Sequence, residues 1–309
     1  MSMKRFVLNL VGFAALVVAV IGSVSIAEIV AEISAYRKEM VAPDGATVLV
    51  CNDSQLQRSV DPSVCPQFFN FCSSGRTLDQ AYLTMLDVLD SPANKGRIRQ
   101  VAFDVSPESL VWLAGRPVGD LDFSGRYYLV HLMHPKATHE FRSFDGWLRV
   151  IRNNLVGERS RLAWKAIRGR KQFKSSLAGG FNYSSEVGME RPERFARSVE
   201  AKAQRTLGYE KVREGDFAYR ILEKVVAAAK VRGVELVFVT TPWHEDLIRA
   251  CGDEAMTAFE RRLAAFAARH NCRYLDFLRE PFPDAAWMDA NHLNATGAKL
   301  FTKRLADRL

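Results

Sequence analysis

The chain has 309 residues, enough for one large or two modest buried cores, and 48% of them are hydrophobic while 25% are charged. This composition excludes a disordered chain and a protein that crosses a membrane many times. The formal net charge of +8 suggests a nucleic-acid partner, but the excess of Lys and Arg is confined to residues 135–214. The basic character therefore belongs to one segment rather than to the whole chain.

An uncharged run from Phe6 to Ala27 follows Lys4 and Arg5. At 1.5 Å per residue this run can span the roughly 30 Å of bilayer hydrocarbon. It is longer than the apolar part of a cleaved signal peptide, although Ser25–Ala27 offers small residues for cleavage. We therefore expect residues 1–45 to form an uncleaved membrane anchor and stalk. The positive-inside rule then predicts a single-pass protein of the cytoplasmic (inner) membrane, with its N-terminus in the cytoplasm and a periplasmic body.

Three apolar runs begin the body of the chain and predict strands over 46–51, 68–71 and 101–105. The first run is short and continuous, as is typical of a buried parallel strand. Apolar residues at helical spacing predict a helix over 78–89. Polar residues follow each predicted strand, at the sheet edge where open α/β proteins carry their chemistry.

Residues 108–215 interrupt this pattern with mixed Gly, aromatic and basic residues and with weak amphipathic patches near 146–168 and 192–206. We interpret 108–215 as a basic insertion or cap. Its stretch Arg149–Lys174 contains a single acidic residue, Glu158, and has tryptophans among its basic residues. Two interpretations stay open, a segment that contacts anionic lipid headgroups and a solvated helical face. Outside the membrane we expect no nucleic-acid partner.

Regular alternation of helix and strand returns after residue 215. Asn294 is the expected N-cap of a last helix, because apolar residues recur after it at helical spacing. Residues 46–309 are therefore predicted to form a three-layer α/β/α domain with a doubly wound parallel sheet. The elements expected in this part are a helix over 216–231, a strand over 234–239, a helix over 254–270 and a strand over 273–277.

The five cysteines are odd in number, so at least one is unpaired within the chain. Cys65 and Cys72 are close enough in sequence to form a disulfide. Cys51 and Cys72 lie in or beside apolar runs, which favours buried thiols instead. Neither the cysteines nor the histidines have the spacing of a metal site, and we expect none.

Asp289 lies three residues before His292, on a segment that leads into the last helix. A carboxylate in that place can orient an imidazole and stabilise its charged form, as in a catalytic base. Ser54, at the end of the first predicted strand, is the candidate nucleophile, because a hydroxyl needs such a base at neutral pH. The alternatives are a polar loop before a surface helix and a serine that only caps a turn.

Three blocks carry a resemblance to a known superfamily: Asn52–Ser54 after the first strand, Ser73–Gly75 after the second and Asp289–His292 before the last helix. In order and spacing they resemble the Gly-Asp-Ser, glycine and Asp-x-x-His blocks of the SGNH (GDSL-like) hydrolases. The resemblance covers residues 46–106 and 216–309. It implies an SGNH-hydrolase, flavodoxin-like sheet.

The resemblance also implies roles for single residues. Ser54 would be the nucleophile, His292 the general base and Asp289 the residue that orients it. The backbone N–H groups of Ser54 and Gly75 would face the developing oxyanion, and glycine suits the second place because substrate must approach the backbone closely.

Two departures from the superfamily pattern stand out. Asn52 occupies the place where the superfamily usually has glycine, and no asparagine follows the third strand, where the chain continues from Asp104 to Ser106. Ser106 could replace that asparagine as an oxyanion donor, or the hole has only two donors. His244, after the strand over 234–239, is either a substrate-binding residue or an ordinary loop residue, and Asp53 is expected to hold the nucleophile's loop.

The tether and the resemblance together are similar in layout to the D-alanine transfer proteins of teichoic acid and to alginate acetyltransferase-like proteins. They imply a serine O-acyltransferase or esterase that acts on a cell-envelope polysaccharide or other acyl acceptor through acyl-Ser54. The donor would come from a membrane-embedded partner, with no further cofactor. The alternative is a non-catalytic SGNH-like scaffold or binding component of an envelope polymer modification or export complex. A third interpretation is a broad lipase or esterase, for which the cap should be apolar rather than basic.

Overall fold

The computed structural model describes residues 30–113, 180–182, 184–185, 187–188, 191–206, 212 and 216–309, and the single positions 23, 133 and 134. Met40–Pro117 and Ala178–Leu309 form one compact unit. Of the other unit, residues 30–39 are helical. Within the described residues, no helix is both long and apolar enough to cross a membrane. The expected anchor over 6–27, apart from position 23, and the basic stretch Arg149–Lys174 lie outside the described residues.

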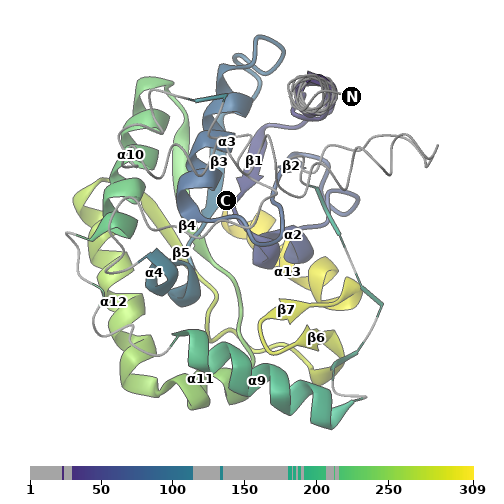
Figure 1. The fold of residues 1–309 in the computed structure, drawn as a ribbon, viewed down its shortest axis with the longest axis vertical. Helices are drawn as coiled ribbons and strands as arrows, with labels where there is room; N and C mark the ends of the chain where they lie inside the picture. Colours follow the sequence, from purple (N-terminus) through teal and green to yellow (C-terminus); the bar gives the residue numbers. More distant parts are fainter. Residues whose placement is uncertain are drawn as a thin grey trace, which may run out of the picture. The chain divides into compact units, whose positions relative to one another are not determined.

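The larger unit is built on a five-stranded sheet (Figure 1). All four strand pairings are parallel, in the order β2-β1-β3-β4-β5, which is one of the two common orders of doubly wound α/β sheets. The predicted parallel α/β architecture is therefore confirmed, and all five carboxyl ends meet at one edge. The strands are β1 (Val48–Cys51), β2 (Phe68–Asn70), β3 (Gln100–Asp104), β4 (Glu235–Thr240) and β5 (Arg273–Asp276).

Four long helices lie close to their predicted positions, and a fifth, over 192–206, lies where the sequence showed only a weak amphipathic patch. Three short helices were not predicted. A helix of six or seven residues is too short to repeat its apolar positions, so its sequence carries no helical period. The long helices are α3 (Leu78–Asp90), α9 (Pro192–Thr206), α10 (Phe217–Val231), α12 (Asp253–Arg269) and α13 (Ala295–Arg308). The short helices are α2 (Ser54–Ser59), α4 (Pro107–Leu113) and α11 (Glu245–Cys251).

Helices cover both faces of the sheet, because strand side chains alternate between them. On β4, Phe238 packs against Phe266 of α12, which also contacts Tyr219 of α10. On the opposite face, Phe277 at the end of β5 packs against Phe301 of α13, and α13 packs on α2. The second face holds a contiguous apolar core that includes Val50 from β1. The result is an α/β/α arrangement.

A small hairpin lies between β5 and α13 and carries the predicted acid–base pair. It comprises the 3₁₀ turn η4 (Asp284–Ala286), β6 (Trp287–Asp289) and the antiparallel β7 (His292–Leu293). Asn294 caps α13 as predicted, because its side chain accepts hydrogen bonds from the backbone N–H groups of Thr296 and Gly297. A Cβ at Gly297 would collide with the carbonyl oxygen of Ala286 and lie 2.9 Å from Leu293. The helix and the hairpin are thus closely packed.

All five cysteines carry free thiols, so the possible bridge between Cys65 and Cys72 is not formed. Cys51 and Cys72 are fully buried, as the alternative interpretation predicted. Burial raises the pKa of Cys51 to about 12 and that of Cys72 well above its ordinary value. Both thiols therefore act as small apolar core groups.

Candidate functional site

The nucleophile candidate Ser54 is the first residue of α2, directly beyond the carboxyl end of β1. Its neighbour Asp53 is the N-cap and accepts a hydrogen bond from the N–H of Gln55 at 2.8 Å. Asn52 has a φ of 139°, in a region that favours glycine. Its side chain compensates by donating to the carbonyl oxygen of Asp104 at 2.8 Å. This geometry explains how asparagine stands where the resembled block has glycine.

Ser54, His292 and Asp289 form a continuous relay. The Oγ atom of Ser54 lies 2.9 Å from Nε2 of His292, and Nδ1 of His292 lies 2.9 Å from Oδ2 and 3.0 Å from Oδ1 of Asp289. With the ring proton on Nδ1, the imidazole donates to Asp289 and accepts the Ser54 hydroxyl proton. The serine and the histidine come from positions 238 residues apart in the chain.

Asp289 is held by more than the imidazole. Its Oδ1 atom also accepts the backbone N–H groups of Asn291, at 3.1 Å, and His292, at 3.0 Å. It accepts the ammonium group of Lys202 from α9 at 2.6 Å. Burial opposes the charge of this carboxylate, but these donors prevail and the pKa of Asp289 is lowered from its ordinary value. The carboxylate therefore stays ionised at any physiological pH.

His292 is largely buried, with 15% of its side chain exposed. Desolvation lowers the pKa of the imidazole, the positive charge of Lys202 lowers it further, and Asp289 acts in the opposite direction. A neutral imidazole is the form that can remove a proton from a serine hydroxyl. The ring is therefore in its base form at neutral pH.

The loop after β2 lies beside the nucleophile's loop. The N–H of Ser73 donates to the carbonyl oxygen of Asn52 at 3.1 Å, and the hydroxyl of Ser74 donates to Gln57 of α2 at 2.6 Å. Gly75 has a φ of 74°, which a side chain would strain, although a Cβ there would meet nothing within 4 Å. In the described part of the chain, no group accepts a hydrogen bond from the backbone N–H of Ser54 or of Gly75.

The loop after β3 leads directly into the short helix α4 and carries Ser106. Ser106 is fully buried and precedes α4, where its Oγ atom accepts the N–H of Ser109 at 3.1 Å, while the hydroxyl of Ser109 donates to the carbonyl oxygen of Ser106. This reciprocal pairing is a helix cap. No hydrogen bond within the described ranges joins Ser106 to Ser54, so its oxyanion role stays a prediction without a contact to support it.

Two carboxyl groups, the buried Asp104 and the half-buried Asp53, lie close to the nucleophile. Asp104, at the end of β3, is fully buried, and burial followed by the charge of Asp53 raises its pKa well above the ordinary value. Burial, and then the charge of Glu108, raises the pKa of Asp53 to about 6, although the N–H of Gln55 opposes this. Like charges in a desolvated place disfavour double ionisation, so this pair holds a proton at mildly acidic pH.

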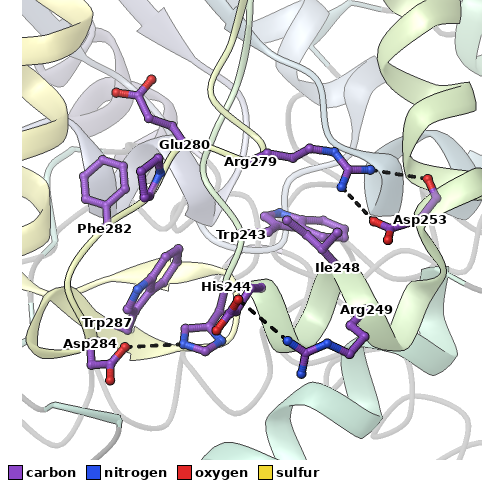
Figure 2. Close-up of a pocket in the computed structure, with 12 residues that line it drawn as sticks. Trp243, His244, Ile248, Arg249, Asp253, Arg279, Glu280, Phe282, Asp284 and Trp287 are labelled. Carbon is purple, nitrogen blue, oxygen red and sulfur yellow. Dashed lines mark hydrogen bonds and ion pairs between the residues drawn. The ribbon is translucent and has the colours of Figure 1, made fainter.

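His244 lies on a neighbouring feature, a pocket of about 490 Å³ beside the hairpin (Figure 2). The ring of His244 is stacked edge-on between Phe195 and Trp287, and its Nδ1 atom accepts the N–H of Asp246 as the N-cap of α11. None of the three relay residues lines the pocket, which is formed by Trp243, His244, Glu245, Ile248, Arg249, Asp253, Arg279, Glu280, Pro281, Phe282, Asp284 and Trp287. The predicted substrate-binding role of His244 has no contact with the relay to support it.

Comparison with known proteins adds nothing to this geometry, since neither a protein-family model nor a curated protein matches the chain. Within the described residues, no group of three or more His, Cys, Asp or Glu side chains could hold a metal ion.

Sequence reasoning missed Lys202 and the residues that fix the nucleophile's helix. Lys202 lies on α9, which the sequence assigned to the insertion, yet α9 belongs to the same compact unit as the sheet. Gln55 accepts hydrogen bonds from the hydroxyl of Thr241, at 2.6 Å, and from the indole N–H of Trp243, at 3.1 Å, and so ties α2 to the loop after β4. A single lysine or glutamine carries no local signal for such contacts. Only the amphipathic pattern of 192–206 could have indicated that α9 packs.

Proposed function

We propose that the chain is a serine-dependent acyl-transfer enzyme, an O-acyltransferase or esterase that works through an acyl-Ser54 intermediate. The observation that carries the proposal is the relay itself, with Ser54 Oγ 2.9 Å from His292 Nε2 and His292 Nδ1 2.9 Å from Asp289. Nucleophile, base and orienting carboxylate stand in the order and at the distances that acyl transfer requires.

In the proposed reaction, His292 takes the hydroxyl proton as Ser54 attacks the acyl carbonyl, and it then returns that proton to the leaving alcohol. An incoming hydroxyl, from water or an acceptor, reverses these steps and frees the serine. The N–H groups of Ser54 and Gly75 are the proposed oxyanion donors. Their lack of other acceptors in the described part of the chain supports this role.

The resemblance of the three blocks, together with the strand order, supports an SGNH-hydrolase fold for the larger unit. We propose in addition, from the sequence of residues 1–45, a tether in the cytoplasmic membrane with the catalytic unit in the periplasm. The proposed acceptor is a cell-envelope polysaccharide, and the proposed acyl donor is presented by a membrane-embedded partner.

The test is a covalent probe. The full-length protein is treated with a serine-reactive fluorophosphonate and its intact mass is measured, alongside Ser54→Ala and His292→Ala. Ser63→Ala is the matched control, because the hydroxyl of Ser63 donates to Asp61 on a loop and has no part in the relay. We expect one adduct on the wild type and the control and none on the other two. A folded wild-type protein that takes up no adduct would refute the proposal.

A second candidate is a non-catalytic scaffold or binding component of an envelope complex. The observation that favours it is the loop after β3, where no asparagine follows the strand and the Oγ atom of Ser106 accepts the N–H of Ser109 in a helix cap. Losing one oxyanion donor typically costs about 2.7–4 kcal/mol of transition-state stabilisation. In this case Ser54→Ala should leave the cellular role intact, which complementation with that variant would reveal.

A further inference from the structure

Lys202 is an almost buried lysine that touches the relay from an element far away in sequence. Its side chain is 12% exposed, and its Nζ atom lies 2.6 Å from Asp289 Oδ1 and 3.2 Å from His292 Nδ1. The ammonium group also donates to Oδ1 of Asn291. One cation is thus in contact with both His292 and the carboxylate that orients it.

The position of Lys202 is built into the fold. Helix α9 packs on α4, α11 and β6, and Figure 1 shows it beside α11 and the hairpin. The ring of Phe195, two turns before Lys202, contacts His244. Asn291 is 3% exposed and donates from Nδ2 to Glu108 at 3.4 Å. A long, flexible side chain is therefore confined to one place.

We propose that Lys202 is a positioning residue of the relay, which fixes the Asp289 carboxylate and opposes the positive charge that His292 acquires when it takes the serine proton. This inference rests on the proposed acyl-transfer function. An ammonium group 3.2 Å from Nδ1 makes the protonated imidazole a stronger acid, because two like charges repel at that distance. The imidazolium then gives its proton more readily to the leaving alcohol.

The same ammonium group partly neutralises the Asp289 carboxylate, which is the group that stabilises the imidazolium. A carboxylate that accepts several charge-assisted hydrogen bonds attracts a neighbouring cation less strongly. Both effects of Lys202 act in one direction, towards a neutral His292. The lowered pKa of His292 agrees with this direction.

Other charged groups face this part of the site. Arg58 of α2 also opposes protonation of His292. Glu108 of α4 attracts the ammonium group of Lys202, whereas Arg205, on α9 like Lys202, repels it. The Arg205 guanidinium lies 3.5 Å from the Glu108 carboxylate. Asp53 lies within the field of both Glu108 and Lys202. Among the described residues, Lys202 is the cation hydrogen-bonded to Asp289.

The experiment follows the imidazole directly. The full-length protein is labelled with ¹⁵N-histidine, and the ring nitrogens of His292 are titrated by NMR in the wild type, Lys202→Met, Lys202→Gln and Lys202→Arg. Arg197→Met removes one positive charge from an exposed position of the same helix and is the matched control. The pH dependence of fluorophosphonate labelling at Ser54 is measured on the same proteins.

We expect both neutral variants to raise the titration midpoint of His292 by about one pH unit or more, and to move the acidic limb of labelling upward equally. Lys202→Arg and Arg197→Met should leave the midpoint near the wild-type value. If both neutral variants fold but leave the midpoint unchanged, Lys202 only anchors α9 and the inference fails.

The two readouts separate this inference from the proposed function. A shifted midpoint without any labelling of Ser54 would refute the acyl-transfer proposal and leave the action of Lys202 on His292 standing. Labelling of Ser54 with no shift in the His292 midpoint would support the acyl-transfer proposal and refute the proposed action of Lys202. Lys202→Gln keeps a donor for Asp289, so it guards against a Lys202→Met variant that fails to fold.

Discussion

The two sides of Ser54 are built differently. On the base side, the Asp289 carboxylate accepts four hydrogen bonds, two from backbone N–H groups and two from side chains. His292 contacts both Asp289 and Ser54. On the other side, the Oδ1 atom of Asn52 is buried without a hydrogen-bond partner in the described part of the chain, and the charge of Asp53 disfavours ionisation of the buried Asp104. The carboxylate on the base side has all its hydrogen bonds from the protein itself, whereas the side expected to face an oxyanion holds a buried acceptor without a donor among the described residues. Changes on the two sides should therefore differ in kind.

The largest effect is expected from Asp289→Asn. The amide keeps the shape of the carboxylate but removes its charge and favours the wrong imidazole tautomer, so labelling of Ser54 by the fluorophosphonate should slow by about 10⁴-fold. The rate is read from the growth of the adduct in the intact mass. A loss of less than tenfold would show that His292 does not depend on the carboxylate.

Gly297→Ala should disturb the base side without touching the relay. Its Cβ would collide with the carbonyl oxygen of Ala286 and press on Leu293, the residue after His292. Overpacking of this kind costs about 1–3 kcal/mol, so urea unfolding should shift and labelling should slow. Thr296→Ala, one residue earlier and exposed, is the control and should change labelling little. Equal behaviour of the two variants would mean that the hairpin adapts.

Asp104→Asn tests the other side through pH. Because the pKa of Asp53 is raised from 3.8 to about 6, the pair contributes stability at low pH that is lost as pH rises through about 6. The variant removes one of the two like charges, so its free energy of unfolding should fall less than that of the wild type between pH 4 and pH 7. Urea unfolding at both pH values measures the difference. Parallel curves would show that the carboxyl groups do not interact.

The smallest effect on stability is expected from Gly75→Ala. A side chain at a φ of 74° costs about 1–2 kcal/mol, and no neighbour within 4 Å adds to this. Gly45→Ala is a matched control, since its φ is 81° and its surroundings are equally open. Both variants should lose similar stability in urea, while only Gly75→Ala should slow labelling. If labelling falls equally in both, Gly75 has no special part in the site.

The same contrast explains what could be predicted from the sequence. The acid–base pair could be predicted because Asp289 and His292 lie three residues apart, before a helix whose N-cap, Asn294, is recognisable. The parallel sheet could be predicted because short apolar runs, such as those of β1 and β4, alternate with helical patterns. These are local signals that survive in any tertiary context.

The remainder depends on contacts between distant residues. Lys202 and Asp289 are 87 positions apart in the sequence, and the sequence pattern around either residue does not predict their contact. The cap role of Ser106 follows from α4, which is too short to predict. The positive φ of Asn52 is a property of the turn after β1 that the amino-acid type does not reveal.

The strand order has a consequence for how such a site can change. The chain leaves β1 towards the face covered by α2 and leaves β3 towards the face covered by α10, so the two neighbouring strands part at a topological switch point. Ser54 lies directly beyond the carboxyl end of β1, at this switch point. The location of the chemistry is thus a property of the topology, and the identity of the chemistry is a property of a few loop residues. Substitutions in those loops could install a different reaction while the sheet stays unaltered.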